Sequence, residues 1–140
     1  QRIKDVVFNW DKILNFDGET GPYVQYTYAR CASVLRKAGD VVILEDIDYN
    51  VLTDEVTMNL LKDITRFPDV VKDAADKYEP FMISRFAVSV AQHFNKFYHD
   101  CQINVEDEKI KMARLKVVSV TMKVIKDALA LLGIECPEQM

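Results

Sequence analysis

The last part of the chain carries the pattern that most restricts its fold. From about residue 106 to 132 nothing interrupts a helix, and the apolar residues at helical spacing form two adjacent stripes. One stripe is Ile110, Ala113, Val117, Val120, Val124, Ala128 and Leu131; the other is Leu115, Val118, Met122, Ile125, Leu129 and Leu132. A helix that is apolar over so wide an arc has to be covered by several neighbouring helices. The sequence therefore predicts a bundle built around this segment.

Other segments supply the neighbours. Apolar spacing, caps and prolines predict helices over 2–15, 23–38, 53–66 and 68–77, and a long helix that begins at Pro80. The β-branched run 41–44 has no partner strand elsewhere in the sequence, so we interpret it as a connection between helices. The expected fold class is all-α, a bundle of about six helices, and residues 1–140 are expected to form one domain.

Composition bounds the class of protein further. Of 140 residues, 49% are hydrophobic and only four are glycine and four proline, which is typical of a globular chain and not of a disordered one. No apolar run is long enough to cross a bilayer, and the first residues do not form a secretory signal. Three widely spaced cysteines indicate reduced thiols. We expect a cytoplasmic monomer, cut from a longer protein because the chain starts at Gln1 and is helical almost at once.

Charge is distributed unevenly along the chain. A net charge of −4 argues against a general nucleic-acid binder. However, residues 40–63 contain seven acids and one lysine, whereas residues 109–126 contain six bases and no acid. A local basic strip can therefore lie within an acidic total.

A polar face of the predicted helix 23–38 is the first candidate site. Gly18 and Gly21 punctuate the loop before it, and Pro22 suits the first helical position. Steps of three and four residues place one set of side chains together: Tyr23, Tyr26, Arg30, Ser33 and Lys37. Two tyrosines and two cations on one face can stack bases and meet phosphates. An amphipathic rim, whose long side chains lie along the edge of the core, is the structural alternative.

Three stretches of the sequence resemble arginyl-tRNA synthetases. The run Phe-Asp-Gly-Glu-Thr-Gly-Pro-Tyr-Val-Gln-Tyr-Thr-Tyr-Ala-Arg at 16–30 is similar to the opening of their C-terminal helical domain. The runs 94–98 (Phe-Asn-Lys-Phe-Tyr) and 127–140, which ends at Met140, also match, in the same order along the chain. That domain is named for an Asp-Ala-Leu-Arg run, and this chain departs from it because its fourth residue is Ala130. The departure weakens any role for a cation at that position, but not the resemblance itself.

The resemblance implies a fold, a function and partners. The fold would be the anticodon-binding domain of a class I aminoacyl-tRNA synthetase. The domain would grip the anticodon loop of tRNA(Arg), and the parent arginine–tRNA ligase would attach arginine to that tRNA using ATP. The expected partners are tRNA(Arg) and the parent's own catalytic domain, with no membrane. Arginine anticodons share a central cytosine, which gives such a site one base to recognise.

The resemblance also implies site residues. The matching positions place Tyr23, Tyr26, Tyr98 and Met140 on the anticodon surface. Three further candidates are placed by their helix faces alone: Arg30, Asn95 and Lys96. For Tyr98, packing in the core beside Phe94 and Phe97 is an equal alternative.

Catalytic and metal chemistry is not expected within this chain. The His-x-Gly-His motif is absent, and Lys-Met-Ala-Arg at 111–114 only echoes a Lys-Met-Ser-Lys-Ser loop because it falls inside the last predicted helix. His93 and His99 are separated by about 600° of helix rotation and cannot face one metal ion. We expect no cofactor here, and ATP and Mg in the parent's catalytic domain. A second hypothesis is a helical docking module whose acidic stretch 40–63 binds a basic protein.

Overall fold

The computed structural model describes residues 7–14, 18–39 and 47–140. Every regular element in these ranges is helical, which confirms the all-α prediction for the described residues. The elements are α1 (Trp10–Ile13), α2 (Gly21–Ala38), the 3₁₀ helix η1 (Tyr49–Val51), α3 (Glu55–Thr65), α4 (Phe67–Lys77), α5 (Phe81–Asp100) and α6 (Glu108–Leu131).

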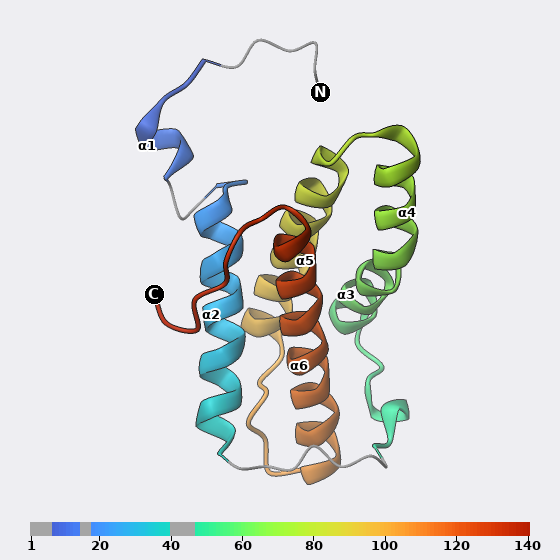
Figure 1. Cartoon of the computed structure of the whole chain (residues 1–140). Coiled ribbons are helices and arrows are strands. Elements are labelled where there is room, and N and C mark those ends of the chain that lie inside the picture. The colour runs from blue at the N-terminus through green and yellow to red at the C-terminus, as the bar shows by residue number, and fades with distance from the viewer. Residues whose placement is uncertain (1–6, 15–17, 40–46) are drawn as a thin grey trace.

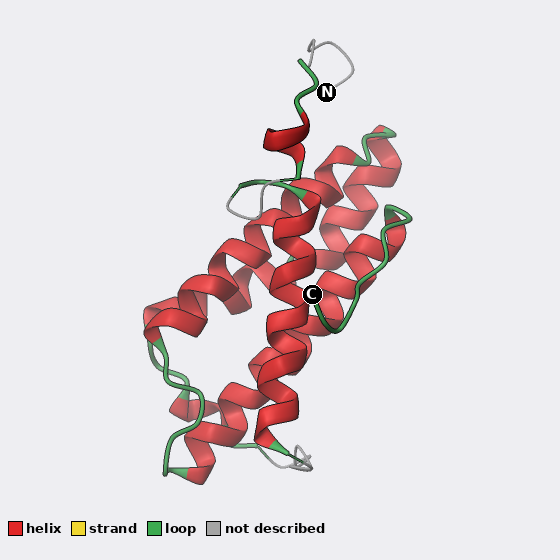
Figure 2. Cartoon of the chain, turned by 90° about the vertical axis from the view of Figure 1, so that its left-hand side faces the viewer, coloured by secondary structure: helices red, strands yellow, loops and turns green. Residues whose placement is uncertain are grey.

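The bundle is arranged around α5 and α6, which pack against each other. Helix α2 packs along both of them, while α3 and α4 cover the other side of α5. Figure 1 shows α2 at one side of α6 and the pair α3 and α4 at the other, and Figure 2 shows the same helices after a quarter turn. This arrangement brings α2 beside the second half of α5.

The predicted apolar stripes form most of the core, but the prediction is wrong for Leu131, which ends the first stripe and is 55% exposed at the last turn of α6. In α6, Ala113, Val118 and Ile125 have no solvent exposure. The apolar spacing that predicts the helix after Pro80 corresponds to a buried stripe of α5, which consists of Ile83, Phe86, Ala87, Val90, Phe94 and Phe97. The wide apolar arc of α6 is buried because α2, α3 and α5 all contact it.

The predicted number of about six bundle helices is too high. Within the described part of segment 2–15, only the four residues of α1 are helical, and the side chain of Trp10 is 65% exposed. Helix α1 makes no extensive contact with another described element. Four residues form a single turn, which is too short to bury an apolar stripe. The run 41–44 lies outside the described residues.

Two predicted helix starts, at 23 and 53, differ by two residues from the observed ones at Gly21 and Glu55. In α2, Thr20 is the N-cap and accepts from the Tyr23 N–H at 3.2 Å, so Pro22 takes the second helical position instead of the first. In α3, Asp54 is the N-cap, so the helix begins at Glu55. The Asp54 carboxylate accepts from the Thr57 N–H at 2.7 Å and from the Thr57 hydroxyl at 2.8 Å.

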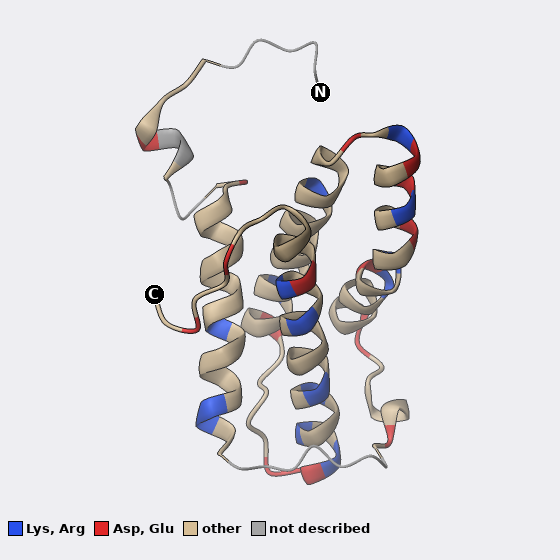
Figure 3. Cartoon of the chain, viewed as in Figure 1, with Lys and Arg blue, Asp and Glu red and all other residues tan. Residues whose placement is uncertain are grey.

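Charged residues are unevenly distributed over the fold. Figure 3 shows basic residues along α6 and on the last turns of α2, whereas α4 carries acidic and basic residues side by side. The basic turns of α2 carry Arg36 and Lys37. None of the helices described here is long and apolar enough to span a bilayer.

Replacing Leu129 with alanine tests the central role of α6. The Leu129 side chain is 2% exposed, so its truncation leaves a cavity and lowers the free energy of unfolding by about 2–5 kcal/mol. Leu131, two residues later, is 55% exposed, and Leu131→Ala serves as the matched control with a change of about 0.5 kcal/mol or less. Urea unfolding followed by circular dichroism measures both. Equal losses for the two variants would contradict this packing.

The Asp54 cap makes part of the stability sensitive to acid. Burial raises the pKa of this carboxyl, but its hydrogen bonds from Thr57 and Cys101 outweigh burial, and the pKa lies below its ordinary value. The unfolded state then binds more protons, so this stability is present above the ordinary carboxyl pKa and is lost as the pH falls through the folded value. Asp54→Asn should be less stable than the native chain at pH 7, and the difference should shrink below about pH 4. Thermal melts across pH measure it, and a difference that does not change with pH would refute it.

Candidate functional site

Helices α2 and α5 bring the predicted polar face together with two residues of α5. The guanidinium of Arg30, on α2, donates through Nη1 to the Asn95 Oδ1 atom of α5 at 2.6 Å. The same guanidinium lies over two rings, with its central carbon 5.0 Å from the Tyr26 ring centroid and 5.1 Å from that of Tyr98. Both rings are 41% exposed. Arg30 is therefore held between two aromatic rings that solvent still reaches.

Tyr98 belongs to both alternatives considered from the sequence. Its ring stacks on the fully buried Phe94 ring, with centroids 6.3 Å apart. Tyr98 is nevertheless 41% exposed, and its ring also contacts the Arg30 guanidinium. The ring is thus anchored by the core on one side while it forms part of the surface on the other.

A polar network fixes the amide of Asn95. Its Nδ2 atom donates to the Tyr23 hydroxyl at 2.9 Å and to the Thr27 Oγ1 at 3.1 Å. Thr27 is fully buried, and its hydroxyl donates to the backbone oxygen of Tyr23 at 3.0 Å. With both amide protons engaged by α2, the amide oxygen has to face Arg30. Tyr23, which is partly buried, therefore supports Asn95 and, through it, Arg30.

The C-terminal tail lies along α2. The Gln25 side chain donates through Nε2 to the backbone oxygen of Glu135 at 2.8 Å, and Arg36 donates through Nη1 to that of Glu138 at 3.2 Å. Gln25 and Arg36 are eleven residues apart, which is about three helical turns, so they lie on one face of α2. Figures 1 and 2 both place the end of the tail beside α2. Sequence reasoning missed both residues, because their acceptors are backbone oxygens and leave no specific signal in the sequence.

A hollow of about 370 Å³ opens where α2, α5 and the tail meet. We call it the Arg30 hollow. Four predicted site residues line it, namely Tyr26, Arg30, Tyr98 and Met140, and Ser33 and Lys37 of the predicted polar face line it too. Tyr23 and Asn95 do not line it but hold Arg30 in place. Lys96 is exposed on α5 and is not part of its wall.

The charged residues in the wall of the Arg30 hollow are mainly cationic. Arg30, Arg36 and Lys37 line it, with Glu138 as the acidic member. The charge of Glu138 is also felt by the buried Tyr28 hydroxyl, whose pKa is raised by burial first and by Glu138 second. Aromatic rings, cations and an adaptable methionine around one opening suit a flat, polar ring attached to an anionic chain.

The other candidates from the sequence point elsewhere. The Nδ1 atom of His93 lies 2.9 Å from the Asp63 carboxylate, whereas that of His99 lies 2.7 Å from Asp100. Cys101 is buried, and its pKa is raised by burial and by the Asp54 charge. In the part of the chain that the structure describes, no three histidine, cysteine or acidic residues are grouped so that they could hold a metal ion.

Residues 111–114 and the acidic stretch are used within the fold. Lys111 pairs with Glu108 at 3.2 Å, and Arg114 donates to the backbone oxygen of Gln102 at 2.6 Å, both from within α6. In the acidic stretch, Asp63 is only 5% exposed. Its carboxylate accepts a hydrogen bond from the Ser89 hydroxyl and also contacts the His93 ring. Asp54 caps α3, and residues 40–46 lie outside the described ranges. These bonds leave fewer acids available to a basic partner than the sequence predicted.

Comparison with solved structures identifies similar folds. Arginyl-tRNA synthetase of Thermus thermophilus superposes with a TM-score of 0.86 at 30% identity, over 95% of this chain and 23% of that one. Arginyl-tRNA synthetase of Plasmodium falciparum gives a TM-score of 0.84 at 26% identity, over 98% of this chain and 24% of that one.

Sequence comparison points the same way. The arginine–tRNA ligases of Alkaliphilus metalliredigens and Halothermothrix orenii are 55% and 51% identical to the chain over 99% of its length. The chain spans 24% of the length of each of these relatives. Residues 24–140 match the model of the family described as the DALR anticodon binding domain. The chain therefore belongs to the DALR anticodon binding domain family, as its resemblance to arginyl-tRNA synthetases predicted.

Proposed function

We propose that this chain binds the anticodon loop of tRNA(Arg) and that the Arg30 hollow receives the central cytosine of the anticodon. The observation that carries the proposal is the position of Arg30, which lies between two half-exposed tyrosine rings beside Met140. Single-stranded bases are recognised by stacking on aromatic rings and by hydrogen bonds to their exposed edges. The hollow offers both kinds of contact.

The roles of the site residues follow from their positions. Tyr26 and Tyr98 supply stacking surfaces, and Met140 supplies a polarizable contact from the tail. Arg30 carries five N–H donors, of which one is used by Asn95, so the guanidinium can donate to the O2 and N3 acceptors of cytosine. Asn95 and Tyr23 hold the guanidinium in the orientation required. Lys37 and Arg36 are placed at the wall to meet phosphates.

The remainder of the proposal concerns the parent protein. We propose that residues 1–140 form one domain of a monomeric, cytoplasmic arginine–tRNA ligase, which attaches arginine to tRNA(Arg). Catalytic residues, ATP and Mg would belong to the ligase's catalytic domain, which would be the other partner of this chain. The relatives at 55% and 51% identity support this, as do the helical bonding of residues 111–114 and their place within α6.

Binding of tRNA tests the proposal, with Tyr26→Ala as the informative variant. Loss of one stacking ring should weaken binding of tRNA(Arg) by about 1–3 kcal/mol while the melting temperature stays nearly unchanged, because Tyr26 lies outside the core. Tyr49→Ala is the matched control, since Tyr49 is an exposed tyrosine of η1 that does not line the Arg30 hollow. Fluorescence anisotropy at several salt concentrations, with tRNAs altered at the central anticodon base, measures affinity and specificity.

The native chain should bind tRNA(Arg) more weakly as salt rises and should discriminate against a changed central base. Equal affinity of the native chain for all four central bases would refute the proposal. Binding of a basic protein in place of tRNA would instead favour the docking-module hypothesis. If Tyr26→Ala unfolds the chain, Tyr26 is a core residue and its assigned role is wrong.

The tail provides a second prediction. Deleting Gln139 and Met140 should weaken binding of tRNA(Arg) and reduce discrimination of the central base, because both residues line the Arg30 hollow. The melting temperature should not fall, since Met140 is 55% exposed. The hydrogen bonds from Gln25 and Arg36 go to the backbone oxygens of Glu135 and Glu138, which the truncated chain keeps. Anisotropy titrations of the truncated and intact chains measure the change. Unchanged discrimination after truncation would show that the tail does not read the anticodon.

A further inference from the structure

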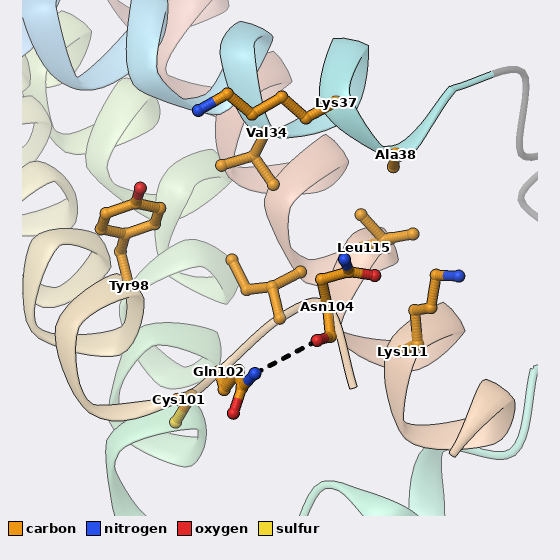
Figure 4. A pocket seen from close by; sticks show the side chains of 10 residues that line it. Val34, Lys37, Ala38, Tyr98, Cys101, Gln102, Asn104, Lys111 and Leu115 are labelled. Atoms are coloured by element: carbon orange, nitrogen blue, oxygen red, sulfur yellow. Dashed lines mark hydrogen bonds between the residues drawn. The ribbon is translucent and has the colours of Figure 1, made fainter. Parts of the chain in front are cut away.

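The C-terminal tail, residues 134–140, supplies a wall of the Arg30 hollow that the helices do not. Residues 138–140 line the hollow together with residues of α2 and α5. A neighbouring hollow of about 300 Å³ is formed by α2, the end of α5, residues 101–104 and α6 (Figure 4). Its described lining includes no residue of the tail. The tail therefore completes one of these two hollows and not the other, so its position decides the shape of the Arg30 hollow.

Two side chains of α2 hold the tail in this position. Chain ends usually fray unless they are tied down. Gln25 donates through Nε2 to the backbone oxygen of Glu135 at 2.8 Å, and Arg36 donates through Nη1 to that of Glu138 at 3.2 Å. The earlier residue of α2 binds the earlier residue of the tail, so the two segments run in the same direction (Figure 1). Because both acceptors are backbone atoms, the tail's side chains stay available to the hollow.

The two donors differ in their relation to the Arg30 hollow. Arg36 lines it and can therefore contact a bound strand directly. Gln25 is partly buried and is not among the residues of the wall. Its amide instead contacts the tail five residues before Met140. The bond to Glu135 is thus the route by which the Gln25 side chain can affect the hollow.

We propose that Gln25 is a positioning residue for recognition of the central anticodon base. Its bond fixes the backbone at Glu135, two residues before Pro137, whose ring restricts the direction in which the chain continues. The last three residues are thereby directed into the Arg30 hollow. This inference rests on the proposed function, because the central base has to occupy that hollow. Gln25 itself touches no base, and without its bond the base loses part of its contact with Met140.

Replacing Gln25 with glutamate tests the inference with little change of shape. An ionised glutamate has the same length but no amide protons, so it cannot donate to the Glu135 oxygen. Gln92→Glu is the matched control, since it makes the same change of charge at an exposed position of α5 outside the wall of the Arg30 hollow. Gln25→Ala removes the donor without adding charge. Anisotropy titrations with tRNA(Arg), and with tRNAs altered at the central anticodon base, measure the affinity and discrimination of each variant.

Gln25→Glu and Gln25→Ala should each weaken binding of tRNA(Arg) roughly 2- to 10-fold, as expected for one lost hydrogen bond, and should reduce discrimination of the central base. Gln92→Glu should leave the discrimination unchanged. In a chain that ends at Pro137, the three tail residues of the hollow are missing, so Gln25→Ala should have no further effect. A role in the stability of the fold would instead weaken binding equally in both chains and lower the melting temperature.

Nuclear magnetic resonance of the methionine methyl groups follows the tail without RNA. The chain has five methionines, and the methyl signal that is lost in the chain ending at Pro137 belongs to Met140. In Gln25→Glu and Gln25→Ala, this signal should narrow and move toward the position of an unstructured methionine. Gln92→Glu should leave it in place. Circular dichroism confirms that each variant is folded.

Two results would overturn the inference. One is an unchanged Met140 signal and unchanged discrimination in both Gln25 variants. The other is an equal effect of Gln25→Ala on binding in the intact chain and in the chain that ends at Pro137. If either occurs while Tyr26→Ala still weakens binding, the proposed function stands and only the role of Gln25 is lost. If the native chain does not discriminate the central base, the proposed function fails, and with it the role of Gln25 in recognition.

Discussion

Burial of α6 is the constraint on which the rest of this fold depends. Its apolar arc is too wide for one neighbour, so α2 and α5 both have to lie along it. Two helices that press against a common third helix also meet each other along their edges. The candidate site lies at that seam, where Arg30 of α2 meets Asn95 and Tyr98 of α5. Packing thus places the site, although Tyr26, Arg30 and Tyr98 themselves lie outside the core.

Hydrogen bonds at the seam between α2 and α5 fix the orientation of the Asn95 and Arg30 side chains more than they add to the free energy of unfolding. A typical bond contributes about 1 kcal/mol net, which is small beside the burial of the aromatic side chains of α5. However, a buried polar group without a partner is costly, and the Thr27 hydroxyl is fully buried. It is satisfied only when it faces the Tyr23 backbone and the Asn95 amide. The result is one allowed arrangement of Asn95, and through it one preferred position of the Arg30 guanidinium.

The spacing of apolar and polar residues in the sequence predicted the features that depend only on which side chains share a helix face. It placed the α5 stripe in the core and gathered Tyr26, Arg30, Ser33 and Lys37 on one face, because both results follow from helix geometry. It did not reveal the bonds from Gln25 and Arg36 to the tail. Their acceptors are backbone oxygens, which every residue has, so the sequence contains no specific signal for them. It also overestimated the helix count, since spacing over 2–15 cannot show whether a neighbour exists to bury the stripe.

The run 127–130 explains how a helix end directs the tail to the site. Ala128 and Leu129 are buried, while Asp127 pairs with Lys123 at 2.9 Å on the surface. The fourth residue, Ala130, is exposed, so the absence of arginine there costs the core nothing.

The end of α6 depends instead on the backbone conformation at Gly133. The Gly133 N–H donates to the Ala130 oxygen and the Ile134 N–H donates to the Leu129 oxygen, both at 3.0 Å, with Gly133 at a φ of 72°. This pair of bonds is the Schellman arrangement, in which glycine is favoured because it adopts positive φ without strain. This cap turns the chain back from α6 onto α2, where the Gln25 side chain donates a hydrogen bond to the backbone oxygen of Glu135.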